Sequence, residues 1–359
     1  MVLISLLLLL LNFLILRIES EWIYEKQFPI NSETIKLPPI LLYCIYMGEI
    51  TYDYIEYTLE SMYYNSNVDF VLINVLEDIR RSNHTIKNHL KHHYHHISSH
   101  KMNIFVHEIS IRDFSYLVYS KLNIKVHNYM NSSWYYKMCD YKPTLAYLFP
   151  EFLKKKSYLY WGYADLDVIW GKISKFSYLF FNHTFPIVMS GWWHSTGAAT
   201  FYENKKWTQE LFKSDPIYVK LLANQTYHNL DEAGTQIPPS NVIDDGIHSI
   251  NSLQIKVLQS TEPPINRNTG KIPEDHLFID TEDVKEWAGK VIWKEGELII
   301  VNSSKFFPPK RQLMFFHRPH PKLNYAREHR RHMIAKGKIL GFELPYWNLL
   351  CERNCKEVM

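Results

Sequence analysis

At residues 161–171 the chain reads Trp-Gly-Tyr-Ala-Asp-Leu-Asp-Val-Ile-Trp-Gly, with two aspartates at positions i and i+2 directly after an aromatic run. Side chains alternate between the faces of an extended strand, so Asp165 and Asp167 are expected on one side, close enough to share one hard cation. Leu166 and Val168 are expected to turn the other way into apolar packing. The alternative is an Asx turn in which both carboxylates cap a loop. The stretch favours a divalent metal site at the end of a buried strand.

The residues just upstream strengthen this interpretation. Residues 137–143 read Lys-Met-Cys-Asp-Tyr-Lys-Pro, and they precede a helix predicted over residues 143–153. Proline is well tolerated at the first turn of a helix, where its missing N–H is not needed. This helix leads directly into the strand that carries the aspartates. We therefore expect Asp140 and Lys142 near the same rim of the sheet as Asp165.

Together, the segments YKMCDYKP (136–143) and YWGYADLDVIWG (160–171) resemble a largely uncharacterised family of predicted glycosyltransferases with the GT-A fold. The resemblance covers most of residues 38–322, and continues more weakly through Ser190-Gly191, residues 200–204, Leu230-Asp231-Glu232 and His317. It implies a single α/β domain with a mostly parallel central sheet covered by helices, and we expect a small antiparallel C-terminal extension. It also implies a nucleotide-sugar donor and a glycan, glycoprotein or glycolipid acceptor.

A nucleotide-sugar transferase must neutralise a diphosphate leaving group, and a divalent cation held by carboxylates does this. By the resemblance, Asp167 ligates the metal directly and Asp165 contacts the ribose or the metal through water. His317 matches the late histidine that completes such sites, and imidazole beside carboxylates suits Mn²⁺ better than Mg²⁺. The alternative for His317 is a histidine that merely ends a strand. The donor-binding residues expected are Tyr46, Gly48, Asp140, Lys142, Asp165 and Gly191.

Catalysis is expected from a second acidic pair. The transferring sugar passes through an oxocarbenium-like state, so a carboxylate near its anomeric carbon is useful as a base or as a stabilising anion. Asp231 and Glu232 are the best-matched candidates, and either can be the acting residue. The alternative is an acidic pair that starts a helix. Asp244-Asp245 is a competing acidic site that a simple turn explains.

Residues 190–194, Ser-Gly-Trp-Trp-His, are expected to build the sugar pocket, because glycine permits close approach and an indole face packs on a pyranose. One of Trp192 and Trp193 is expected to face the site and the other the core. Ala198 and Ala199 follow in the stretch that leads to Thr200, and they give that loop few polar groups for acceptor hydroxyls.

Strands that alternate with helices in the first half predict a mostly parallel, covered sheet. The predicted strands are 39–46, 70–76 and 103–107, and the predicted helices are 53–65 and 113–122. Right-handed crossovers bring the loops of an active site to the C-terminal ends of such strands, where Gly48, Asn74, His107 and the two aspartates are expected. The less regular second half predicts a strand at 187–189, a helix at 204–212, a hairpin at 291–301 and a strand at 312–316.

The N-terminus indicates the compartment. Residues 2–16 are apolar apart from Ser5 and Asn12, which fits a signal-peptide core or an unusually short membrane anchor. Either leads into the secretory pathway, to the Golgi lumen as a type II membrane protein or to secretion. Glycosylation sequons agree with lumenal exposure, and they begin at Asn83, Asn131, Asn182, Asn224 and Asn302. The predicted organisation is a signal or anchor at 1–20, a linker at 21–37, the transferase domain at 38–348 and a tail at 349–359.

Composition excludes several other classes of protein. With 46% hydrophobic residues the 359-residue chain can bury a large core, and a net charge of +3 gives no overall field that favours nucleic acid. There is no Gly-rich phosphate loop and no Gly-x-Ser-x-Gly elbow. The histidines of residues 89–96 lack carboxylate or cysteine companions and indicate a solvated face. The rival functions are a carbohydrate-binding protein on the same fold without turnover, and a metal-dependent phosphoester hydrolase.

Overall fold

The computed structural model describes residues 36–49, 55–79, 86–93, 103–126, 136–183, 186–189, 197–214, 217–228, 230–231, 257–259, 290–294, 296–301, 310–317 and 341–344. The predicted N-terminal signal or anchor, most of the linker and the C-terminal tail lie outside these residues. Within them, no helix has the length and apolar character needed to span a membrane.

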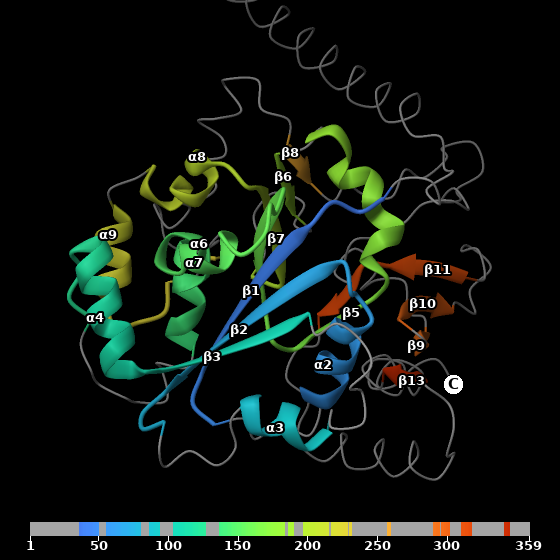
Figure 1. Cartoon of the computed structure of the whole chain (residues 1–359), viewed down its shortest axis with the longest axis horizontal. Coiled ribbons are helices and arrows are strands. Elements are labelled where there is room, and N and C mark those ends of the chain that lie inside the picture. The colour runs from blue at the N-terminus through green and yellow to red at the C-terminus, as the bar shows by residue number, and fades with distance from the viewer. Residues whose placement is uncertain are drawn as a thin grey trace, which may run out of the picture.

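A seven-stranded sheet forms the centre of the molecule, in the order β3-β2-β1-β4-β7-β6-β8 (Figure 1). Strands β1, β2, β3 and β4 pair in parallel, β7 is antiparallel to both β4 and β6, and β6 pairs in parallel with β8. The strands are β1 (Ile40–Met47), β2 (Val68–Leu76), β3 (Ile104–Ser110), β4 (Tyr160–Ala164), β6 (Ile187–Met189), β7 (Ala199–Glu203) and β8 (Val257–Gln259). The predicted mixed α/β fold with a mostly parallel sheet is confirmed.

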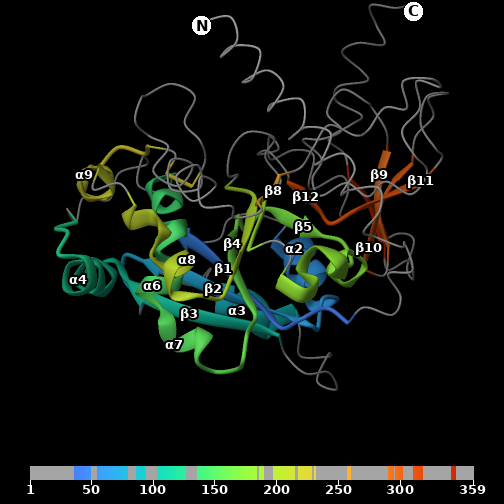
Figure 2. The same cartoon turned by 90° about the horizontal axis from the view of Figure 1, so that it is seen from above.

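Helices cover both faces of this sheet, because its strands are apolar on both sides. Along β1, Leu41 and Tyr43 belong to one buried cluster, whereas Leu42 and Cys44 belong to the other. The first cluster packs against α4 (Ile111–Leu122), α6 (Leu145–Leu148), α7 (Pro150–Leu153), η4 (Leu211–Lys213) and α9 (Ile217–Ala223). The second packs against α2 (Ile55–Tyr63), α3 (Ile86–His93) and the 3₁₀ segment η3 (Ile173–His183). Figures 1 and 2 show the two groups of helices on opposite sides.

The C-terminal part adds antiparallel strands beside β5 (Figure 2). One sheet has the order β11-β10-β9-β13, and a separate pair joins β5 to β12. The strands are β5 (Val168–Trp170), β9 (Lys290–Lys294), β10 (Glu297–Val301), β11 (Lys310–Leu313), β12 (Phe315–His317) and β13 (Gly341–Leu344). The Trp293 indole donates to the Trp170 carbonyl at 2.9 Å and so ties this extension to β5. The predicted antiparallel extension and its 291–301 hairpin are confirmed.

Three local predictions need correction. The helix predicted over 143–153 is a 3₁₀ segment, η2 (Met138–Thr144), followed by the short α6 and α7. Pro150 explains the break, since the residue before a proline avoids helical geometry, and Phe149 has φ −125° and ψ 54°. The strand predicted over 312–316 divides at Met314, which is buried where the chain passes from one sheet to another.

His107 is the third correction. It lies in the middle of β3, opposite Ile73, and not at the end of that strand. Its ring packs edge-on against Phe149 and Phe152. It therefore belongs to the packing between the sheet and the helices.

Candidate functional site

The two aspartates lie immediately after β4. Asp165 N–H donates to the Ala198 carbonyl at 3.1 Å, which extends the β4–β7 pairing by one residue. Leu166 and Asp167 then form a turn into β5, so the aspartates are not on an extended strand as the sequence pattern predicted. The apolar packing predicted for Leu166 and Val168 is confirmed, because both side chains are buried in the second cluster.

A buried lysine joins this turn to the other acidic segment. Lys142 Nζ lies 2.5 Å from Asp165 Oδ1 and 2.6 Å from Asp231 Oδ2, and it donates to the Gly197 carbonyl at 3.1 Å. Lys142 and Asp231 are each 1% exposed, whereas Asp165 is 20% exposed. Burial acts to lower the pKa of Lys142, but the two carboxylates outweigh it and hold that pKa well above its usual range. Lys142 is therefore an ammonium shared by two carboxylates.

Asp231 is fixed by three segments of the chain. Its backbone carbonyl accepts from the Tyr163 hydroxyl at 3.3 Å, and its Oδ1 accepts from the Tyr227 hydroxyl at 3.4 Å. With Lys142 on Oδ2, the carboxylate is oriented from both sides. Its predicted partner Glu232 lies outside the described residues.

Asp140 is expected to bind the donor, but both oxygens of its carboxylate are bound to other groups of the protein. It is fully buried and pairs with Lys137 Nζ at 2.7 Å. Its carboxylate also accepts from the backbone N–H groups of His228, at 3.0 Å, and Leu230, at 2.9 Å. Asp140 therefore holds the segment that carries Asp231, and it is a positioning residue.

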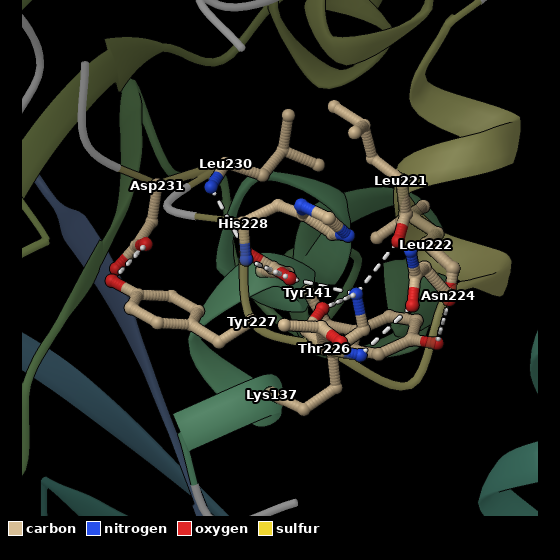
Figure 3. A network of polar contacts seen from close by, with 11 residues as sticks. Lys137, Tyr141, Leu221, Leu222, Asn224, Thr226, Tyr227, His228, Leu230 and Asp231 are labelled. Atoms are coloured by element: carbon tan, nitrogen blue, oxygen red, sulfur yellow. Dashed lines mark hydrogen bonds and ion pairs between the residues drawn. The ribbon is translucent and has the colours of Figure 1, made fainter. Parts of the chain in front are cut away.

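Lys137, which the sequence analysis did not single out, completes this network. Its ammonium donates to the carbonyls of Leu221 at 2.7 Å and Thr226 at 3.2 Å, and the neighbouring Tyr141 hydroxyl donates to the Leu222 carbonyl (Figure 3). Burial lowers the pKa of Lys137, and the charge of Asp140 opposes that shift. The one available sequence signal was the i, i+3 spacing of Lys137 and Asp140 on a helical turn.

Tyr46 and Gly48 lie at the end of β1, at the same edge of the sheet. Gly48 has φ +89°, its N–H donates to the Val75 carbonyl, and its own carbonyl accepts from Asn74 Nδ2 at 2.9 Å. β1 runs parallel to β4 with Tyr43 opposite Tyr163, so the end of β1 runs alongside the turn of the two aspartates. The role expected for Tyr46 and Gly48 in donor binding stays a prediction.

His317 is brought to this turn by strand pairing. β12 runs antiparallel to β5, and His317 stands opposite Val168, the residue directly after Asp167. The backbone thus joins two positions that are far apart in sequence. Shared ligation by the two side chains stays a prediction, since among the described residues no group of three metal-ligating side chains is assembled.

The residues present nevertheless fit a hard divalent cation. Asp165 and Asp167 both keep partial exposure at the end of β4, and carboxylate oxygens are the donors that Mg²⁺ and Mn²⁺ accept alongside water. One oxygen of Asp165 is engaged by Lys142, and direct ligation by Asp167 stays a prediction.

Two expectations about the sugar pocket have different outcomes. Gly191, with the rest of the 190–194 segment, lies outside the described residues. Ala198 and Ala199, expected in a loop near the acceptor, are buried, and Ala199 begins β7. Their apolar character reflects burial in the sheet, so it says nothing of acceptor recognition.

Comparison with known proteins gives one family and several distant structures. A model described as a family of unknown function (DUF6625) matches residues 42–342. No curated protein matches the chain. A mannosyltransferase from Pyrobaculum calidifontis, solved with GDP-Man and Mn²⁺, is 9% identical with a TM-score of 0.33, over 69% of this chain and 62% of that one.

Two further structures align over nearly their whole lengths. Mouse xyloside xylosyltransferase 1 is 11% identical with a TM-score of 0.33, over 78% of this chain and 99% of that one. A glycosyltransferase involved in glycosylation of the major capsid of PBCV-1 is 10% identical with a TM-score of 0.32, over 82% of this chain and 100% of that one.

Proposed function

The chain belongs to the family of unknown function DUF6625, and we propose that it is a glycosyltransferase that moves a sugar from a nucleotide-sugar donor to a glycan, protein or lipid acceptor. The observation that carries the proposal is Lys142, which joins the Asp165–Asp167 turn to Asp231 through two ion pairs. Three sequence segments singled out for donor, metal and catalytic roles thus meet at one buried ammonium.

The Asp165–Asp167 turn is the proposed donor end of the site. Asp167, with Asp165 and His317, would hold Mn²⁺ or Mg²⁺. When bound, such a cation neutralises the charge that develops on a diphosphate leaving group. Lys142 orients Asp165, because the pair is short and the lysine is buried. Tyr46 and Gly48 lie at the end of the adjoining strand, where a donor nucleoside would be contacted.

Asp231 is the proposed acid–base or charge-stabilising group. Because two partners hold the two oxygens of its carboxylate, its position is fixed before substrate binds. A carboxylate paired with Lys142 suits either acceptance of the proton of an acceptor hydroxyl or stabilisation of positive charge at the anomeric carbon. Glu232 remains the alternative carboxylate for this role.

The test is a screen of UDP- and GDP-sugars for Mn²⁺-dependent hydrolysis and transfer by the full chain. We expect Asp231→Asn or Glu232→Gln to lower kcat by about 10² or more, the range typical of a lost acid–base group, with nucleotide affinity nearly intact. Turnover within a few-fold of wild type in both variants would remove the pair from catalysis.

The same experiment separates the rival functions. Binding of sugar without nucleotide would indicate a carbohydrate-binding protein, and hydrolysis of simple phosphoesters would indicate a phosphoesterase. The proposal places the enzyme in the secretory pathway, in the Golgi lumen or secreted, because of the apolar run at residues 2–16 and the sequons. Detection of the chain only in the cytosol would contradict that part.

A further inference from the structure

We propose that Tyr136 and Tyr227 form a platform that binds the acceptor sugar beside Asp231. This inference rests on the proposed function, and it names the place and chemistry of the acceptor site. The acceptor class is a pyranose with an apolar ring face and a free hydroxyl. We call Tyr136 and Tyr227 the tyrosine pair.

The tyrosine pair is a surface feature and not part of the core. Tyr136 is 55% exposed, although most large apolar and aromatic side chains among the described residues are buried. Its ring lies 6.2 Å from the ring of Tyr227, centroid to centroid, and the two planes are inclined by 36°. The two rings therefore present neighbouring aromatic surface at the protein boundary.

One member of the pair, Tyr227, is in direct contact with the proposed catalytic group. The Tyr227 hydroxyl donates to Asp231 Oδ1 at 3.4 Å, and Figure 3 shows the Tyr227 side chain extending toward that carboxylate. A sugar that packs on these rings would lie beside the Tyr227 hydroxyl, which is hydrogen-bonded to the buried Asp231 carboxylate. This is the place where an acceptor must stand if Asp231 acts on its hydroxyl.

The buried network below the pair fixes both tyrosines. Tyr136 directly precedes Lys137, whose ammonium is bound to Asp140 and to two carbonyls. Tyr227 lies between Thr226, whose carbonyl accepts from Lys137, and His228, whose N–H donates to Asp140. Both backbones are thus held by the same ion pair, although the tyrosines are far apart in sequence.

Rigid aromatic rings at a boundary suit carbohydrate. The C–H face of a pyranose packs on an aromatic face, and the tyrosine hydroxyl supplies a polar contact at the rim. Because the network holds residues adjacent to both tyrosines in the sequence, little backbone freedom is lost when the sugar arrives. The position of the pair next to Asp231 favours the acceptor over the donor, whose metal is assigned to the turn at Asp167.

The experiment measures binding and transfer separately. Saturation-transfer NMR of the full chain with methyl glycosides of glucose, galactose, mannose and xylose tests direct binding, with UDP and GDP titrated in parallel. Transfer to the corresponding p-nitrophenyl glycosides gives an acceptor KM. The variants are Tyr136→Ala, Tyr136→Trp and, as matched control, Tyr116→Ala, which removes a tyrosine 71% exposed on α4.

We expect Tyr136→Ala to reduce glycoside binding about tenfold, the effect of losing a stacking contact of roughly 1.4 kcal/mol, and to weaken nucleotide binding much less. Tyr136→Trp should restore binding, and Tyr116→Ala should behave as wild type. The inference is overturned if no glycoside binds the wild type, if Tyr136→Ala binds as well as wild type, or if Tyr116→Ala is equally impaired. Absence of turnover with intact Tyr136-dependent binding would instead overturn the proposed function.

Discussion

Lys142 is a buried cation with two anionic partners, and that arrangement makes its removal costly. Without it, Asp165 and Asp231 lose their common counter-ion, and Asp231 remains a buried charge. We expect Lys142→Met to lower the free energy of unfolding by about 3–5 kcal/mol, the usual result of breaking a buried pair. Urea denaturation measures this.

A second substitution identifies the cause of that loss. Lys142→Met combined with Asp231→Asn should be more stable than Lys142→Met alone, because the unpaired charge is gone. As a control, Lys175→Met breaks a pair with Glu297 in which both side chains are about one third exposed, and it should cost under about 1 kcal/mol. Equal losses for Lys142 and Lys175 would show that the shared ammonium is not a structural charge.

His228 gives the fold a dependence on pH. Burial lowers its pKa, the charge of Lys137 lowers it further, and Asp140 opposes them. Its Nε2 is buried and has no hydrogen-bond partner among the residues that the structure describes. A lowered pKa means that the unfolded chain takes up the proton first as the pH falls below about 6.5. The contribution of His228 to the free energy of unfolding should therefore be fully present above that pH and be lost as the pH falls below it.

His228→Gln tests this directly. The variant should lose less stability than wild type between neutral and mildly acidic pH, measured as Tm across a pH series. His107, whose pKa is also lowered by burial, contributes in the same sense in both proteins and so does not affect the comparison. A pH profile unchanged by the substitution would contradict the assignment.

Among the elements, β4 has little room for a side chain at Gly162. A Cβ at Gly162 would lie 2.4 Å from the Thr200 carbonyl oxygen and 2.8 Å from Leu42 Cδ2, so alanine there would separate β4 from β7 or β1. We expect Gly162→Ala to cost at least about 1–3 kcal/mol and to shift the aspartates that follow β4. Denaturation and Mn²⁺ titration together measure both effects.

Ala164→Gly provides the comparison within the same strand. It removes a buried methyl group instead of adding one, so it should cost about 1 kcal/mol and leave the strand pairing in place. A Gly162→Ala protein as stable as Ala164→Gly would mean that the neighbours of Gly162 can yield.

An element can be predicted from sequence when a local pattern of apolar and turn residues marks its bounds. β1, β2 and the hairpin of β9 and β10 were predictable, because their apolar runs end at glycine or polar residues. β7 was not predicted, although Thr200, Phe201 and Tyr202 favour strands, because its place in the sheet is fixed only by pairing to β4 and β6. The break at Phe149 was readable from Pro150, but the division at Met314 depends on two sheets that only the folded chain brings together.

In the candidate site, too, some features follow from local sequence and others only from the fold. Local sequence placed Lys142 near Asp165 and pointed to Asp231 separately, and only the fold shows that one ammonium joins all three. Lys137 was missed because its partners include the carbonyls of Leu221 and Thr226, and backbone acceptors have no signature in sequence. Asp140 illustrates the converse, a residue whose motif suggests a ligand contact although its oxygens bind the protein itself.

At the scale of the whole molecule, the metal site depends on the pairing of β12 with β5. Asp167→Ala should abolish Mn²⁺-dependent nucleotide binding, and His317→Ala should weaken Mn²⁺ affinity by about tenfold or more, since each would remove a ligand. Isothermal titration with Mn²⁺ and UDP or GDP measures both. His332→Ala, which removes a histidine outside the described residues, serves as the control and should bind as wild type.

The ion pairs of Lys137 and Lys142 also have a consequence for the order in which the chain can fold during translation. Both lysines emerge from the ribosome long before the carbonyls of Leu221 and Thr226 and the carboxylate of Asp231 that complete their surroundings. Until residue 231 is available, a nascent chain that buried these ammonium groups would leave them short of partners, at a cost of several kcal/mol. The early strands therefore cannot close their final packing as they appear, and folding of the domain waits for a segment made more than halfway through synthesis.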